Sequence, residues 1–127
     1  MTRIGVLGGT FDPIHHGHLA LGQAAHELLD LDTTLFVPAA RPPHKEGERV
    51  TNPELRCKMV ELAIAGNPAF ALSRIELDRP GLSYTIDTLR TIATQPNPSG
   101  EEVEIYLILS VESLLGFHEW EDPTGIL

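Results

Sequence analysis

Two histidines close to a pair of glycines are the residues of this sequence whose types and spacing best suit chemistry. Gly8 and Gly9 follow a short apolar run, and His15 and His18 stand three residues apart where a helix should begin. At that spacing both imidazole rings can face one ligand. Glycines allow a ligand to approach the backbone closely, and a helix N-terminus attracts phosphate through its free N–H groups and its dipole. The pattern predicts a phosphate site in which both imidazoles donate hydrogen bonds during phosphoryl transfer.

Other sites that use such residues fit the sequence less well. A Walker phosphate loop requires G-x-x-x-x-G-K-[ST] and a dinucleotide fingerprint requires G-x-G-x-x-G, and neither string occurs. Zinc could be held by Asp12, His15 and His18, but the single cysteine and the absence of a second ligand cluster make that weak. We therefore assign no metal ligands, and a purely structural role of the histidines is the remaining alternative.

The elements that must position these residues are those of an α/β fold. The apolar pattern predicts strands over residues 4–7, 33–37 and 103–109, an extended segment over 70–77, and helices over 17–29, 53–65 and 85–92, with short helices in 114–127. The expected core positions of the second helix are Leu55, Met59, Leu62 and Ala63. Strands and helices alternate, which suits right-handed crossovers and predicts one doubly wound, Rossmann-like domain over residues 1–127. Ligands of such folds bind at the carboxyl ends of the strands.

Composition narrows the function classes. The net charge of −9 argues against general nucleic-acid binding. Five of the nine lysines and arginines nevertheless fall between Arg41 and Lys58, a local basic strip that suits a small anionic ligand or is a solvated surface. No apolar run is long enough to span a bilayer, and no signal peptide is evident. With a single cysteine, a cytoplasmic location is the default expectation.

Residues 8–19, G-G-T-F-D-P-I-H-H-G-H-L, resemble the motif of the H/T-x-G-H nucleotidyltransferases, in the form typical of bacterial nicotinate-mononucleotide adenylyltransferases. The resemblance implies transfer of the adenylyl group of ATP to nicotinate mononucleotide, with Mg²⁺ bound mainly through the ATP phosphates. It makes His15 and His18 catalytic. The residues that it assigns to the ATP phosphates are Gly8, Gly9, Thr10, Phe11, His15 and His18.

Three further segments resemble the same family. Residues 42–45 resemble its P-P-H-K loop, which implies that His44 and Lys45 bind the mononucleotide. Residues 83–89 resemble S-Y-T-x-D-T-L, which implies that Thr85 recognises the pyridine carboxylate, although Ser83 or Thr85 could simply cap a helix. Residues 117–120 resemble F-x-x-W, which implies that Trp120 stacks on the pyridine, unless it is an ordinary core aromatic.

A fourth likeness, to R-x-x-M-x-x-L-A over residues 56–63, leaves Arg56 either on the surface or as an organiser of the neighbouring loop.

The sequence departs from the family pattern in two places. Ser110-Val111-Glu112 stands where the family has G-x-D, so that a ribose contact through Glu112 would be displaced by one methylene. No I-S-S-T-x-I-R string follows, so the resemblance lacks the family's C-terminal third. We expect little turnover from this chain alone. An unpaired sheet edge or an uncovered apolar face would make the chain marginally stable, prone to aggregation or a homo-oligomer such as a dimer. The alternatives are a relative that uses another phosphate acceptor, such as phosphopantetheine, and a non-catalytic binding protein.

Overall fold

Four parallel strands form a single sheet in the computed structural model, which describes residues 1–41, 49–95 and 100–127. The strands are β1 (Thr2–Gly9), β2 (Thr33–Pro38), β3 (Phe70–Leu72) and β4 (Val103–Leu107), in the order β3-β2-β1-β4. In the centre of the sheet Val6 of β1 lies opposite Leu35 of β2 and Leu107 of β4.

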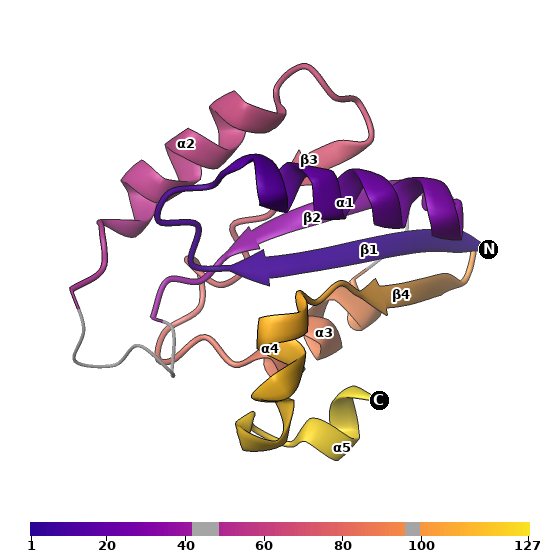
Figure 1. The fold of residues 1–127 in the computed structure, drawn as a ribbon. Coiled ribbons are helices and arrows are strands. Elements are labelled where there is room, and N and C mark those ends of the chain that lie inside the picture. Colours follow the sequence, from indigo (N-terminus) through magenta and orange to yellow (C-terminus); the bar gives the residue numbers. More distant parts are fainter. Residues whose placement is uncertain (42–48, 96–99) are drawn as a thin grey trace.

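Helices cover both faces of this sheet (Figure 1). They are α1 (His16–Leu29), α2 (Pro53–Ile64), α3 (Thr85–Thr94), the short α4 (Val111–Leu115) and α5 (Pro123–Ile126), and a 3₁₀ turn over Phe117–Glu119. Helices α1 and α2 lie on one side, and α3 with the C-terminal helices lies on the other. The predicted Rossmann-like class is therefore confirmed. None of the helices in the described ranges is long and apolar enough to cross a membrane.

The core follows from the two-residue alternation of the central strands. Leu7 and Phe36 point to the α1/α2 side, where they pack with Val60 of α2. Their neighbours Val6 and Val37 point to the opposite side and pack with Ile92 of α3. Because both faces are covered, the strands are apolar along nearly their whole length, as is usual for parallel sheets.

The sequence-based assignment of the buried face of α2 is wrong for three of its four residues, and only Met59 is partly buried. Leu62 is 69% exposed and Leu55 is 55% exposed, and Ala63 is also exposed. The buried residues are instead Arg56, Cys57, Val60 and Ile64. The helix carries apolar residues on two faces, and the face with Arg56 is the one turned to the sheet. The extended segment expected over 70–77 is also shorter, because only Phe70–Leu72 pairs with β2 before the chain turns.

The connectivity determines where a ligand can enter. From β1 the chain moves outward through β2 to β3 and then crosses back to β4 on the other side of β1. Beyond the carboxyl ends of β1 and β4, the outgoing connections therefore separate to opposite faces of the sheet. Such a switch point is where open α/β sheets bind ligands. Gly8 and Gly9 end β1 at this point.

Candidate active site

His15 and His18 form a closely packed pair at the start of α1. Their ring centroids are 3.8 Å apart with 29° between the ring planes. His15 is the residue that caps the helix, and its Nδ1 accepts a hydrogen bond from the backbone N–H of Gly17 (3.1 Å). The Nδ1 atom of His18 accepts a hydrogen bond from the backbone N–H of His15 (3.1 Å). The pair is thus a reciprocal capping box built from two imidazoles.

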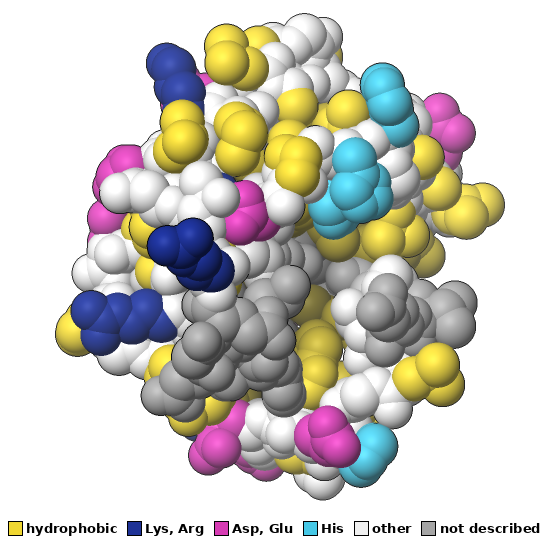
Figure 2. All heavy atoms as spheres, turned by 60° about the vertical axis from the view of Figure 1, so that its left-hand side comes forward, with side chains coloured by type: hydrophobic (Ala, Val, Ile, Leu, Met, Phe, Trp, Pro, Cys, Tyr) yellow, Lys and Arg dark blue, Asp and Glu magenta, His cyan; other side chains and the backbone are white. Residues whose placement is uncertain are grey.

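These two backbone hydrogen bonds assign the tautomers. An Nδ1 atom that accepts a hydrogen bond cannot carry the proton of a neutral imidazole, so the proton of each neutral ring lies on Nε2. Burial, and secondly the nearby His15, lower the pKa of His18 below its usual value. His18 is therefore neutral at pH 7 in the ligand-free protein and offers Nε2–H as a donor. Figure 2 shows histidine side chains side by side on the face that carries the strand ends.

The turn between β1 and α1 is open in front and packed behind. Gly8 is exposed, and a Cβ atom built on it would meet only the carbonyl of Val37 at 3.8 Å. At Gly9 the same atom would lie 3.3 Å from the ring of Phe11. The Phe11 side chain is only 2% exposed and belongs to the core. The ring of Phe11, which the sequence assigned to the ATP phosphates, is therefore turned into the core and not toward a ligand.

Phe11 also supports the histidine pair. Its ring meets that of His18 edge-on at a centroid distance of 4.9 Å. Its backbone has φ = +51°, a left-handed conformation that is rare for a bulky residue and is concentrated at functional sites. Local strain and contact with His18 coincide in one residue of the turn.

Arg56 is a component of the site that the sequence left undecided. It is fully buried and donates hydrogen bonds to the carbonyl oxygens of Thr10, Ala39 and Thr51. It is thus an organiser of loops rather than a member of an exposed basic strip. An arginine that stands in the register of the buried apolar residues Val60 and Ile64 was the available signal.

Ser83 provides a second polar contact of the region, just before the start of α3. The Ser83 hydroxyl accepts hydrogen bonds from the backbone N–H groups of Ala40 and Arg41 (3.1 Å each), and so ties this helix to the end of β2. The residue that caps α3 is Tyr84, without a side-chain hydrogen bond, so neither Ser83 nor Thr85 is the side-chain cap considered from the sequence. Thr85 is the first residue of the helix.

The start of α3 is held by buried polar contacts. The Thr88 hydroxyl donates to Glu76 (2.5 Å), and Arg79 donates to Thr88 (3.0 Å) and to the carbonyl of Tyr84 (3.3 Å). Burial raises the pKa of Glu76, against the opposing effects of the Thr88 hydrogen bond and the Arg79 charge.

The remaining predicted residues fall into separate places. Trp120 is half-buried and packs on Phe117 at a ring-centroid distance of 5.3 Å in the C-terminal segment. Glu112 lies in α4, which follows β4 on the other side of the switch point. His44 and Lys45 lie outside the described residues. Over residues 1–41, 49–95 and 100–127 no group of three or more His, Cys, Asp and Glu side chains is placed to hold a metal ion.

Comparison with known proteins identifies the family of the chain. The cytidylyltransferase-like family model matches residues 6–127. A probable nicotinate-nucleotide adenylyltransferase of Symbiobacterium thermophilum is 48% identical over 122 residues, which are 96% of this chain and 57% of the relative. One of Clostridium botulinum is 42% identical over 127 residues, the whole of this chain and 60% of the relative. The chain thus spans less than two-thirds of the length of these relatives.

Among solved structures, the nicotinic acid mononucleotide adenylyltransferase of Plasmodium falciparum complexed with NaAD superposes with a TM-score of 0.82 at 19% identity. The superposition covers 99% of this chain and 60% of the other, and at that identity it establishes the fold. The predicted resemblance is confirmed by a family match that runs through the glycine turn, the histidine pair and all four strand ends. This chain belongs to the cytidylyltransferase-like family of nucleotidyltransferases.

Proposed function

We propose that this chain binds ATP at the turn between β1 and α1 and transfers its adenylyl group to nicotinate mononucleotide. The observation that carries the proposal is the arrangement of the histidine pair. Both Nδ1 atoms are occupied by backbone N–H groups, so both Nε2 atoms remain as donors at one helix start. That arrangement suits an extended polyphosphate, whose charge shifts between oxygens during the transfer.

The reaction would proceed by direct displacement. A phosphate oxygen of nicotinate mononucleotide forms a bond to the α-phosphorus of ATP while the bond from that phosphorus to the bridging oxygen of pyrophosphate breaks. His15 and His18 stabilise the oxygens that gain charge, and the helix N-terminus contributes its dipole. Their positions are preset by the capping box, so little reorganisation accompanies the transfer.

The divalent ion of this reaction would arrive with the nucleotide. Mg²⁺ is usually bound by substrate phosphates and only one or two protein carboxylates, rather than by a full protein cage. The described part of the chain offers no such cage. A structural relative, a bifunctional NMN adenylyltransferase/ADP ribose pyrophosphatase of Francisella tularensis, was solved with AMP and a manganese ion. We therefore propose Mg²⁺ bound mainly through the ATP phosphates.

The acceptor would lie on the far side of the switch point. The start of α3 offers backbone N–H groups beside Thr85, which suits a carboxylate such as that of nicotinate. Trp120 would stack on the pyridine ring, and His44, Lys45 and Glu112 would contact the rest of the mononucleotide. These roles follow from the resemblance in sequence, as does the preference for nicotinate over another phosphate acceptor.

The test measures binding and turnover separately. Titration calorimetry with Mg²⁺-ATP, and with deamido-NAD as the product, should give saturable binding to the purified chain. Release of pyrophosphate is then measured with nicotinate mononucleotide, nicotinamide mononucleotide and phosphopantetheine as acceptors. Binding without turnover would favour a non-catalytic nucleotide-binding protein, and turnover with phosphopantetheine alone would refute the proposed acceptor. If neither ATP nor deamido-NAD binds, the site assignment itself is wrong.

A further inference from the structure

Arg56 is a buried charge to which the proposed reaction gives no role. Its Nε donates to the carbonyl oxygen of Thr51 (2.7 Å), and its Nη1 donates to those of Thr10 (2.6 Å) and Ala39 (2.7 Å). These three carbonyls belong to the chain after β1, the chain after β2 and the approach to α2. One side chain therefore joins the three segments that surround the carboxyl end of β1.

The chemistry of this contact is unusual for a core arginine. Buried guanidinium groups are normally paired with carboxylates, whereas the hydrogen bonds described here all go to neutral carbonyls. Burial lowers the pKa of Arg56, and the charge of Asp12 is the larger of the two charge effects that oppose this. The Oδ2 of Asp12 accepts the backbone N–H of Thr51 (2.9 Å). The Nη2 of Arg56 is buried with no hydrogen-bond partner among the described residues. Stability alone does not explain so imperfectly paired a charge.

The geometry of the turn supplies another reason. The carbonyl of Thr10 and the N–H of Phe11 belong to one peptide group. The φ angle of Phe11 is the rotation about the N–Cα bond, which joins this peptide group to the Cα that carries the Phe11 ring. Arg56 holds the peptide group, and the core holds the Phe11 ring. Both sides of the rotation are fixed, so the left-handed φ of +51° is maintained. A strained conformation persists only where its surroundings determine it in this way.

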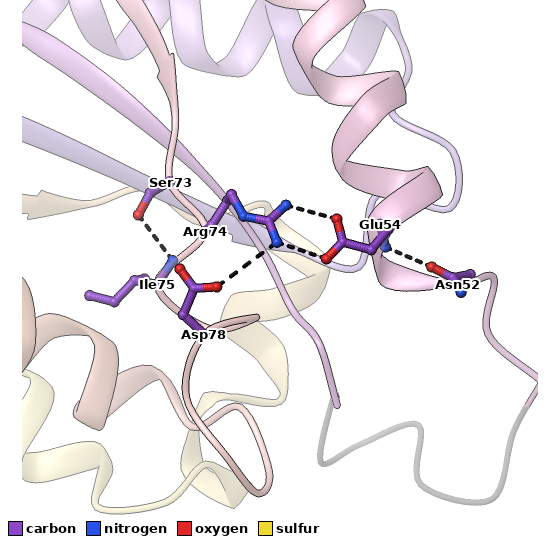
Figure 3. A network of polar contacts seen from close by, with 6 residues as sticks. All are labelled: Asn52, Glu54, Ser73, Arg74, Ile75 and Asp78. Carbon is purple, nitrogen blue, oxygen red and sulfur yellow. Dashed lines mark hydrogen bonds and ion pairs between the residues drawn. The ribbon is translucent and has the colours of Figure 1, made fainter.

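The helix that carries Arg56 is itself anchored at its first turn (Figure 3). Asn52 caps α2 by accepting the N–H of Glu54 (2.8 Å). Arg74, in the segment that follows β3, donates two parallel hydrogen bonds to the carboxylate of Glu54 (2.9 and 2.7 Å). Arg56 lies two residues beyond Glu54, so its guanidinium extends from a fixed base.

We propose that Arg56 is a positioning residue that holds the Thr10–Phe11 turn in the conformation that receives the ATP phosphates. It acts through Phe11, whose ring supports His18 from behind. The part of this inference that concerns ATP rests on the proposed function. The part that concerns the turn is independent of it, because it is a property of the ligand-free protein.

The test compares Arg56→Lys with Val60→Ala. Lysine keeps the charge but has a single ammonium group that cannot reach all three carbonyls as a planar fork does. Val60 is fully buried one turn further along the same face of α2 and belongs to the same core cluster as Phe11, so its truncation weakens the packing around that ring while leaving the three carbonyl contacts of Arg56 in place. Arg56→Lys should shift the backbone amide resonances of residues 10–18 and weaken Mg²⁺-ATP binding about tenfold, the equivalent of one charge-assisted hydrogen bond. Val60→Ala should lower the melting temperature, shift the amide resonances of residues 10–18 less than Arg56→Lys does, and leave Mg²⁺-ATP binding unchanged in the folded protein.

Each outcome decides the inference. If Arg56→Lys leaves the amide resonances of the turn as they are, or if Val60→Ala shifts them equally, Arg56 is only a structural residue. If the wild-type chain fails to bind ATP, the proposed function is refuted, while the amide resonances still decide the role of Arg56. Should Arg56→Lys not fold, Asp12→Ala decides instead. It removes the acceptor of the Thr51 N–H and so loosens one of the three segments that Arg56 joins. The amide resonances of Gly17 and His18, which are not sequence neighbours of position 12, should then shift, and unchanged resonances of these two residues would refute the proposal.

Discussion

Replacing His18 separates its role as a helix cap from its proposed role in catalysis. Two substitutions divide the ring between them: the amide oxygen of His18→Asn can stand near the position of Nδ1, and the amide of His18→Gln can stand near Nε2. The asparagine variant can still accept the N–H of His15 but has no group at the donor position. The glutamine variant can donate at that position but breaks the capping box.

The magnitudes follow from the contacts. His18→Gln should lose the cap, which is worth about 1 kcal/mol, and part of the aromatic contacts with His15 and Phe11, which add about 0.5–1.5 kcal/mol. The better helix propensity of glutamine returns a few tenths of a kcal/mol. We expect its free energy of unfolding to fall by about 1–2 kcal/mol, and that of His18→Asn to fall by less. For nucleotide binding we expect the reverse order, with His18→Asn the weaker binder because it lacks the donor at the Nε2 position. A hydrogen bond to a charged phosphate is worth about 1.5–3 kcal/mol, roughly ten- to a hundredfold in Kd.

Urea unfolding and calorimetric titration with Mg²⁺-ATP at pH 7 measure the two effects on the same samples. His16→Ala is the matched control, since His16 is an exposed neighbour in the same turn of α1. It should bind ATP as the wild type does. If His18→Asn binds ATP with wild-type affinity, His18 is a cap and not a donor. If His16→Ala weakens binding as much as His18→Asn does, the effect belongs to the general charge of the helix start.

Three further predictions test other parts of the molecule. Gly8→Ala should leave the melting temperature unchanged, since its Cβ meets only one atom at an ordinary distance. It should weaken ATP binding, because the methyl group occupies the open side of the turn. A loss of thermal stability together with the loss of binding would contradict the site. Trp120→Ala should raise the KM for nicotinate mononucleotide more than that for ATP, by about two- to tenfold for one stacking contact, and equal effects would make Trp120 a core residue. Burial raises the pKa of Glu76, so the folded protein binds the proton of this carboxyl group more tightly than the unfolded chain does. The free energy of unfolding should therefore fall as the pH rises from about 4.5 through the raised pKa, by about 1.4 kcal/mol for each unit by which the pKa is raised. Glu76→Gln should remove this fall, as measured by urea unfolding between pH 4 and 8, and an unchanged pH profile would contradict it.

Strand periodicity made most of the fold predictable from the sequence. Val6 and Leu7 serve opposite faces of the sheet, as do Phe36 and Val37, and such runs without polar interruption predict a strand covered on both sides. The glycine pair was expected to follow the first strand, and Gly8 and Gly9 end β1 in the structure. These features depend on local pattern, so a single sequence suffices for them.

The errors arose where distant segments decide. The exposed face of α2, with Leu55 and Leu62, is as apolar as the buried one, and periodicity cannot choose between two such faces. The choice depends on Arg56, whose burial is possible only because three separate loops supply carbonyls. Likewise Ser83 is a standard capping residue in type, yet its hydroxyl is used by the backbone of Ala40 and Arg41. Neither partner can be inferred before the fold is known.

The motif G-G-T-F-D-P-I-H-H-G-H acts as one mechanical unit, which explains why its residue types occur together. The proposed phosphate site needs an open front, and the free space at Gly8 suits it. It also needs donors that do not move when charge develops, and the mutual capping of His15 and His18 fixes their rings. The pair would still drift with its turn if nothing held the turn from behind. The buried ring of Phe11 supports the turn from behind. It lies between the sheet and His18, and it reaches this position because the backbone of Phe11 adopts a strained conformation. Openness in front and rigidity behind are therefore consequences of the same turn.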